Sequence, residues 1–317
     1  MTPDPRIHVT LAHLRGLQGA AKGLNFLPRQ PSASVLNGRH ASRLRGRGLN
    51  FEEMRDYLPG DDIRSIDWKA TARTGKAHVR VFTEERDRPA LIVVDQRMSM
   101  FFGTELNMKS VTAAEAAAIS AFRILDAGDR VGGIVFDDDQ QVEVKPQRSQ
   151  RAVFALLEAI AEANARLHAD RAVTRDSASL NVVLGNIARL AHHDHLIIVL
   201  SDFDGVDETT HRRLSGIAAH NDLVLMLVHD PAAVEVRARG RSDGRVVIGD
   251  HAMQAEVDFS SAKTREALTG YSSQRLQHIH SWQNEINLSV LPLNTAAETL
   301  AQIRTLMGRT ATSRRVR

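Results

Sequence analysis

The chain has 317 residues, of which 43% are apolar and 25% charged, a balance typical of a globular protein with a buried core. It has no cysteine, so disulfides, thiolate metal sites and cysteine nucleophiles are excluded. We find no apolar run of the roughly 18 residues that a membrane span needs and no signal-peptide core, and we expect a cytoplasmic protein.

The net charge of +3 is distributed unevenly along the chain. Residues 1–50 carry a net +7 and residues 301–317 a net +5, which leaves −9 for the central part. Basic ends of this kind suit a nucleic-acid contact or an anionic lipid surface. They suit equally well a contact with the acidic body of the same protein, or plain solvation.

The first predicted element is a helix over Asp4–Leu17, where apolar residues recur at helical spacing. Residues 23–48 are rich in Pro, Ser, Gly and Arg and read as a loop, so residues 1–48 form a basic N-terminal helix and loop. Residues 49–89 are dense in charge, and His78–Thr83 alternates polar and apolar side chains as a half-buried strand does. We therefore expect residues 49–89 to form a β-containing subdomain packed on a larger sheet.

From Ala90 the pattern changes to alternating strands and helices. Strands are predicted at Ala90–Asp95, Arg130–Phe136, Gln141–Lys145 (an antiparallel edge), Leu196–Leu200, Leu223–Val228 and Leu288–Leu293, with a hairpin at Val246–Ile248 and Gln254–Phe259. Helices are predicted at Val111–Asp126, Ser149–Leu167, Leu180–Ala191, Glu208–His220, Lys263–Glu285 and Thr295–Met307. Apolar strands separated by helices indicate an α/β fold with a doubly wound, mainly parallel, Rossmann-like sheet. It spans residues 90–307, and residues 308–317 form a basic tail.

Two of these strands end in carboxylates. Asp95 ends the first strand, and Asp202 follows the Leu196–Leu200 strand with Asp204 two residues later. Because neighbouring parallel strands end at the same edge of a sheet, we expect these acids to lie close together. With the hydroxyl of Ser99 nearby, they are hard oxygen ligands of the kind that Mg²⁺ or Mn²⁺ prefers.

The segment from residue 55 to residue 73, RDYLPGDDIRSIDWKATAR, closely resembles the signature of a bacterial family, the domain-of-unknown-function-58 family. We interpret its motif residues as structural, with a turn, an ion-pair network and a tryptophan that anchors packing. These residues are Arg55, Tyr57, Pro59, Gly60, Asp61, Arg64, Asp67, Trp68 and Arg73.

The portion from Ala90 to Leu306 resembles a von Willebrand factor A domain. That resemblance implies a metal-ion-dependent adhesion site built from an Asp-x-Ser-x-Ser loop, a second-loop threonine and a third-loop aspartate. Asp95 and Ser99 match the first loop. Ser177 and Ser179 are the nearest candidates for the second-loop hydroxyl. Asp202 is the candidate for the third loop, with Asp204 as its alternative.

Arg97 departs from this pattern because it stands where the first serine of the loop belongs. A guanidinium that points into the site would fill it and neutralise its acids, and Mg²⁺ binding would then be weak or absent. Alternatively, Arg97 points to solvent and Asp95 holds Mg²⁺ through fewer ligands. In a third interpretation the acids cap loop amides and bind nothing.

Our leading hypothesis is a non-enzymatic protein-interaction module with a degenerate adhesion site and no cofactor, although Mg²⁺ stays possible. Its implied partner is a MoxR-type AAA+ ATPase or another von Willebrand A protein, in protein maturation or assembly. Arg97 and Asp204 would then belong to the contact surface. One alternative is a divalent-metal-dependent hydrolase or nuclease that uses Asp95, Asp202 and Asp204. Another is nucleic-acid binding through the basic termini.

Overall fold

A computed structural model describes residues 4–22, 49–58, 61, 63–84, 89–171, 178–231, 245–250, 253–258, 276–286 and 288–309. The chain forms two compact units. The larger unit contains Met1–Arg29 and Arg88–Arg317, and the smaller contains Gln30–Asp87. The predicted basic loop and basic tail fall largely outside the described residues, so nucleic-acid binding through them stays a sequence-based alternative.

The larger unit is built on a six-stranded sheet with the order β10-β7-β6-β3-β4-β5. All neighbouring strands are parallel except β4 and β5, which are antiparallel. Numbered along the chain, this is the 3-2-1-4-5-6 order of a doubly wound sheet, so the predicted α/β architecture is confirmed. The strands are β3 (Pro89–Asp95), β4 (Arg130–Phe136), β5 (Gln141–Gln147), β6 (Leu196–Ser201), β7 (Asp222–His229) and β10 (Leu288–Asn294).

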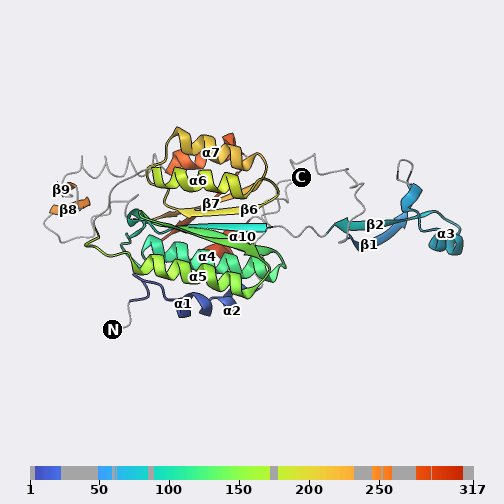
Figure 1. The fold of residues 1–317 in the computed structure, drawn as a ribbon, viewed down its shortest axis with the longest axis horizontal. Coiled ribbons are helices and arrows are strands. Elements are labelled where there is room, and N and C mark those ends of the chain that lie inside the picture. Colours follow the sequence, from blue (N-terminus) through green and yellow to red (C-terminus); the bar gives the residue numbers. More distant parts are fainter. Residues whose placement is uncertain are drawn as a thin grey trace. The chain divides into compact units, whose positions relative to one another are not determined.

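Helices cover both faces of this sheet (Figure 1). On β3, Ile92 and Val94 face one core and Leu91 and Val93 face the other, as the period of two in a strand requires. The first core is shared with α1 (Leu11–Gly16), α2 (Gln18–Ala21), α4 (Lys109–Asp126), α5 (Gln150–Ala165) and α10 (Thr299–Arg309). The second is shared with α6 (Ala178–Leu190), α7 (Glu208–Ala218) and a helical segment over residues 276–285.

Two helices begin later than the sequence predicted. α1 begins at Leu11, because Thr10 is its N-cap and its hydroxyl accepts the His13 N–H at 3.1 Å. α10 begins at Thr299, because the preceding Thr295 hydroxyl is bound to Asp230 at 2.5 Å. Thr10 makes a local capping bond and Thr295 a long-range bond to Asp230, and in both cases the bonded residue lies outside the helix that apolar spacing alone would extend over it.

Each edge strand of the sheet contains a proline. Pro146 lies in β5 and Pro292 lies in β10. Proline has no backbone N–H, so it is tolerated in a sheet mainly at an edge. Lys145, beside Pro146 in β5, is exposed.

The smaller unit has an antiparallel pair of strands, β1 (Leu49–Asp56) and β2 (His78–Glu84). A short 3-10 turn, η1 (Ile63–Ser65), and a seven-residue helix, α3 (Trp68–Thr74), lie between them in the chain. β1 was not predicted, because its sequence LNFEEMRD lacks a regular apolar alternation. In the larger unit, β8 (Arg245–Asp250) and β9 (Met253–Asp258) form the predicted hairpin.

Among the residues described, no helix is long and apolar enough to cross a membrane.

The N-terminal helix is fastened by an ion pair that should make stability depend on pH. Glu115 of α4 accepts from His13 Nε2 at 2.8 Å and from the Thr299 hydroxyl at 2.5 Å. The hydrogen bond to Glu115 raises the pKa of His13. A raised folded-state pKa adds stability below the unfolded pKa of about 6.5, and this stability is lost as pH rises through the folded pKa.

We therefore expect His13→Gln to lower the free energy of unfolding at pH 5.5 more than at pH 8.5, as measured by urea denaturation. In a Glu115→Gln background the same substitution should show no such pH dependence. A loss that is equal at both pH values would contradict this assignment.

Candidate functional site: a paired-charge cluster at the carboxyl edge of the sheet

The carboxyl end of β3 brings Asp95 into the interior. Leu91 to Val94 are buried aliphatic residues, and Asp95, the last residue of the strand, is 0% exposed. Parallel β6 runs beside β3 and ends at Ser201, so Ser201 and Asp202 arrive at the same edge. The Ser201 hydroxyl donates to Asp95 Oδ2 at 2.6 Å, so the two strand ends are in direct contact.

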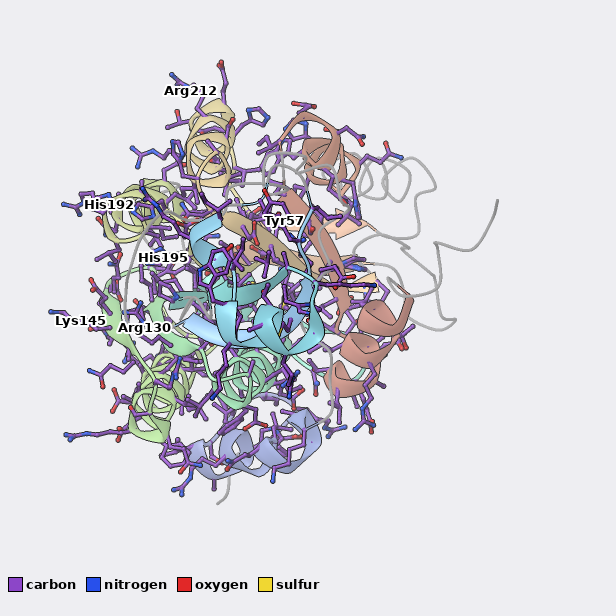
Figure 2. The ribbon with its side chains drawn as sticks, turned by 90° about the vertical axis from the view of Figure 1, so that its right-hand side faces the viewer. Tyr57, Arg130, Lys145, His192, His195 and Arg212 are labelled. Atoms are coloured by element: carbon purple, nitrogen blue, oxygen red, sulfur yellow. The ribbon has the colours of Figure 1, made fainter. Side chains whose placement is uncertain are left out.

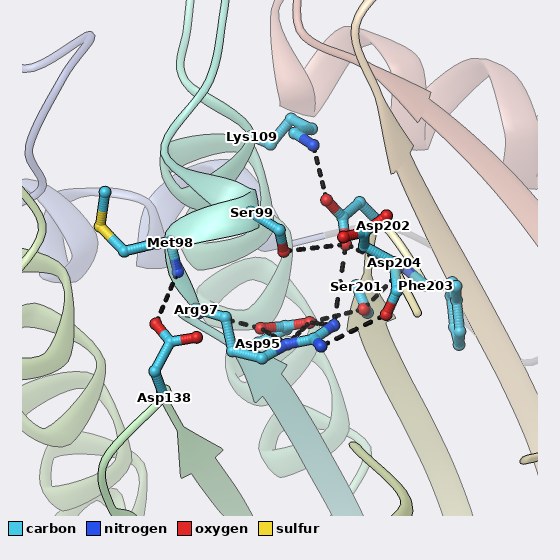
Figure 3. A network of polar contacts seen from close by, with 10 residues as sticks. All are labelled: Asp95, Arg97, Met98, Ser99, Lys109, Asp138, Ser201, Asp202, Phe203 and Asp204. Carbon is cyan, nitrogen blue, oxygen red and sulfur yellow. Dashed lines mark hydrogen bonds and ion pairs between the residues drawn. The ribbon is translucent and has the colours of Figure 1, made fainter. Parts of the chain in front are cut away.

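Arg97 turns back from its loop and pairs with Asp95 (Figure 3). Arg97 Nε lies 3.0 Å from both carboxylate oxygens, Nη2 lies 2.7 Å from Oδ2, and the Arg97 backbone N–H donates to Oδ1 at 2.9 Å. Its side chain is 7% exposed. Burial alone lowers the pKa of Arg97, but the charge and hydrogen bonds of Asp95 outweigh it and the net shift is upward. Arg97 is therefore a permanent internal cation.

Asp202 has a cation of its own, Lys109. Lys109 Nζ lies 2.6 Å from Asp202 Oδ2, while Oδ1 accepts from the Ser99 hydroxyl at 3.3 Å and from the Asp204 N–H at 3.0 Å. Arg97 Nη2 is 3.8 Å from Asp202 Oδ1, which joins the two ion pairs into one network. Asp95, Arg97, Ser99, Lys109, Ser201 and Asp202 are called the paired-charge cluster below.

Lys109 and Ser201 belong to the cluster although no sequence motif marked them. Lys109 is the first residue of α4, and its N-cap Met108 supplies no side-chain hydrogen bond. A positive charge at a helix N-terminus opposes the helix dipole, so a lysine there needs a nearby anion. A lysine at the start of a predicted helix was therefore the feature of the sequence that could have pointed to Lys109. Asp202 is the anion that compensates its charge.

The loops that frame the cluster are pinned by their own hydrogen bonds. Asp138, from the β4–β5 turn, accepts the Met98 N–H at 2.8 Å, and burial raises the pKa of its carboxyl. Phe203, fully buried, has a φ of +52°, a left-handed conformation that non-glycine residues adopt at some cost in energy. The Phe203 N–H donates to the Ser201 hydroxyl at 2.8 Å. This hydrogen bond fixes the backbone between Asp202 and Asp204.

The residues of this cluster do not fit a divalent cation. An ionised carboxylate has about four lone-pair sites, and Asp95 is already within hydrogen-bonding distance of Arg97 Nε, Nη2 and N and of Ser201 Oγ. A bound Mg²⁺ would have to displace these donors and sit beside two fixed positive charges. Within the described part of the chain, no group of three His, Asp or Glu side chains is arranged to hold a metal ion.

The other predicted site residues lie as follows. Asp204 contributes its main chain, because its carbonyl accepts from Arg97 Nη1 at 3.3 Å and its N–H donates to Asp202. Ser179 is in the first turn of α6, but its side chain, like Ser177, is outside the described part. The histidines His192 and His195, which no prediction above includes, precede β6 at the opposite edge of the sheet, where Arg130 begins β4 (Figure 2).

A family model described as "Protein of unknown function DUF58" matches residues 53–278. The chain belongs to this family. Curated relatives of this DUF58 member include "Uncharacterized protein Rv1480" of Mycobacterium tuberculosis and "Uncharacterized protein Mb1516" of Mycobacterium bovis. Each is 31% identical over 223 residues, covering 69% of this chain and 67% of the relative.

Three solved structures are also similar to the chain. A hypothetical protein BatB from Bacteroides thetaiotaomicron is 15% identical with a TM-score of 0.38, covering 71% of this chain and 100% of that one. An aerotolerance-related membrane protein from Bacteroides fragilis is 14% identical with a TM-score of 0.39, covering 70% and 99%. A von Willebrand factor type A protein from Catenulispora acidiphila is 11% identical with a TM-score of 0.34, covering 74% and 44%.

The DUF58 signature residues lie in the smaller unit. Arg55 and Asp61 form a bidentate ion pair with two contacts of 2.7 Å, and the hydrogen bonds from Arg55 and from the Leu58 N–H lower the pKa of Asp61 to about 2. Asp67 is the N-cap of α3. Pro59 and Gly60 lie outside the described residues, Tyr57 is half-buried, and Arg64 and Arg73 are exposed.

Within the smaller unit, one expectation for the signature is not met. Trp68 was predicted to anchor packing, but its side chain is 68% exposed, and the buried residue of α3 is Ala70. A seven-residue helix has few positions facing its own hairpin, and in α3 the inward position is taken by an alanine.

Proposed function

We propose that this DUF58 protein is a non-enzymatic protein-interaction module. Its partner would be a MoxR-type AAA+ ATPase, and the two would act in protein maturation or assembly in the cytoplasm, a location that the cysteine-free sequence suits. The observation that carries the proposal is the paired-charge cluster, in which Arg97 and Lys109 neutralise the two carboxylates. We interpret the cluster as a degenerate adhesion site whose own cations stand where a metal would bind.

The hydrolase or nuclease alternative requires that the carboxylates of Asp95 and Asp202 are not already paired with cations. Asp95 and Asp202 would have to offer free oxygens to a divalent ion or to a reacting water. Asp95 instead accepts hydrogen bonds on both oxygens and is 0% exposed, and both oxygens of Asp202 are within contact of Ser99 or Lys109. Membership of DUF58 and an α/β fold give no evidence of catalysis.

The groups available to a partner at this edge differ from those the sequence suggested. Arg97 is too deeply buried to present its charge, since its guanidinium is taken up by Asp95 and the Asp204 carbonyl. Phe102, in the loop between β3 and α4, is 46% exposed, and Glu105 in the same loop is exposed. In this proposal, the buried Arg97 side chain holds the conformation of the loop, and the exposed residues of the loop contact the partner protein.

The test is a binding titration between the full chain and a purified MoxR-type ATPase encoded in the same genome. Phe102→Ala should weaken binding by roughly tenfold or more, as expected for an aromatic residue at the centre of a contact. Leu190→Ala is the matched control, because Leu190 is 38% exposed at the end of α6, which leads into the opposite edge of the sheet. Absence of binding by the wild-type chain, or equal losses in both variants, would count against the proposal.

A further inference from the structure

The N-terminal segment is tied to the loop that carries the cluster by a relay of buried amides. The strap is defined as residues 4–22 and the site loop as residues 96–108. Val9 of the strap donates its N–H to Asn164 Oδ1 at 2.8 Å, and Asn164 Nδ2 donates to Gln96 Oε1 at 3.0 Å. Gln96 Nε2 in turn donates to the Ser110 carbonyl of α4 at 3.1 Å. Gln96 and Asn164 are both 0% exposed, so the relay runs through the interior.

The strap also contacts the site loop directly. The His8 ring stacks on Phe101 with ring centroids 5.8 Å apart, and the Arg6 carbonyl accepts the Met108 N–H at 2.9 Å. The strap therefore holds the loop at three points: Gln96 begins the loop, Phe101 lies near its middle, and Met108 ends it. Arg97 and Ser99, the cluster residues that the loop supplies, lie between the points that the strap holds.

The strap itself is fixed to the body of the larger unit. Val9, Leu14 and Ala21 are buried in the core shared with α4 and α5. The Arg15 guanidinium lies 4.3 Å from the centroid of the Phe154 ring. At its outer end, Asp4, Arg6 and Ile7 line a cleft of ≈ 200 Å³ together with residues 103–108, beside the hydrogen bond that joins Arg6 to Met108.

Inside the site loop, regular structure is limited to one short 3-10 turn, η2 (Met98–Met100). Cutting the relay would leave the buried amide of Gln96 without its Asn164 donor, and a buried polar group that loses its partner favours a local opening to water. The strands beside it do not depend on the relay, since their hydrogen bonds run along the sheet.

We propose that the strap is the element that keeps the site loop closed over the paired-charge cluster, so that loosening the strap opens the loop while the sheet stays folded. The strap and the site loop then form one cooperative unit, of lower stability than the sheet. The inference concerns the order of the loop and does not depend on which partner binds there.

The test is amide hydrogen exchange on the full chain, comparing two buried asparagines. Asn164→Leu cuts the relay. Asn221→Leu is the matched control, because Asn221 is also buried and makes side-chain hydrogen bonds to Ala191, Ile217 and His195 at the opposite edge of the sheet. We expect Asn164→Leu to accelerate exchange at Arg97, Met98 and Met108 at least tenfold and to leave β3 and β6 protected. Asn221→Leu should accelerate only the segments around its own partners.

Unchanged exchange across residues 96–108 in Asn164→Leu, or equal acceleration there in both variants, would overturn the proposal. If Asn164→Leu does not fold, His8→Ala decides the question, because it removes the stack on Phe101 and the 3.2 Å contact of His8 Nδ1 with the Asn164 carbonyl, and it leaves the amide relay in place. Faster exchange around Phe101 in the site loop would support the strap, and wild-type exchange there would refute it. None of these results decides whether the protein binds a MoxR-type ATPase, because the binding titration tests that proposal separately.

Discussion

Arg97→Ser should create a divalent-cation site at the carboxyl edge of the sheet. The substitution turns the loop into the Asp-x-Ser-x-Ser pattern, and it removes the guanidinium that takes up the oxygens of Asp95. One unit charge at 4 Å contributes about 4 kcal/mol at an effective dielectric constant of 20, or roughly a thousandfold in affinity. Removing the Arg97 charge should therefore have a large effect on the affinity for Mg²⁺ or Mn²⁺.

Lys109 should limit what this first substitution achieves. It stays 2.6 Å from Asp202 Oδ2 and competes with a metal for that oxygen. We therefore expect Arg97→Ser with Lys109→Ala to bind more tightly than Arg97→Ser alone, and Lys109→Ala alone to bind more weakly than either. Isothermal titration with MgCl₂ and MnCl₂, supported by the shift of Tm with metal concentration, measures this order.

Two variants separate a designed site from nonspecific binding. Arg97→Lys keeps a positive charge at the position and should stay insensitive to metal. Adding Asp95→Asn to Arg97→Ser removes the central carboxylate and should abolish the new affinity. Micromolar Mg²⁺ binding by the wild-type chain that disappears in Asp95→Ala would refute our view that the built-in cations replace the metal.

Asp95→Ala should be among the most destabilising single substitutions in the larger unit. It leaves the Arg97 guanidinium, 7% exposed, without its main anion, and breaking a buried ion pair in this way costs about 3–5 kcal/mol. Urea denaturation should record the loss as a lower transition midpoint at an unchanged slope.

A double-mutant cycle of Asp95 and Arg97 distinguishes the loss of a charge pair from the loss of packing. Arg97→Met alone should cost a similar amount, because Asp95 is then the uncompensated charge, whereas Asp95→Ala with Arg97→Met should recover at least about 2 kcal/mol of the summed losses. Lys109→Met should cost less, about 1 kcal/mol, because removing it also relieves the unfavourable charge at the N-terminus of α4. Additive losses in the double variant would show that Asp95 and Arg97 are not coupled.

The sheet was predictable from the sequence because its strands are short, uniformly apolar runs. Ile92 to Val94 in β3 and Ile197 to Leu200 in β6 are covered on both faces, and a continuous aliphatic run between turn signals is what such strands require. Parallel order then places their last residues together, which is why the sequence alone predicts Asp95 and Asp202 at one edge.

Which charged residues pair with one another in the cluster could not be predicted from the sequence. Whether Arg97 faces Asp95 or solvent depends on the direction that the loop takes after β3, and the motif does not encode it. Lys109 is fourteen residues beyond Asp95 and joins the site only because α4 begins at this edge. The amide relay links residues 9, 164 and 96, and no periodic pattern connects positions so far apart in the chain.

The prolines at the two edges of the sheet have a consequence for the protein at high concentration. An edge strand with a continuous row of free N–H and C=O groups can accept a strand from a neighbouring molecule, which is a common start of aggregation. Pro146 in β5 and Pro292 in β10 interrupt the row of donors, and the exposed ammonium group of Lys145 adds charge beside one of them. We therefore expect the two prolines to disfavour growth of the sheet by strand addition at either edge.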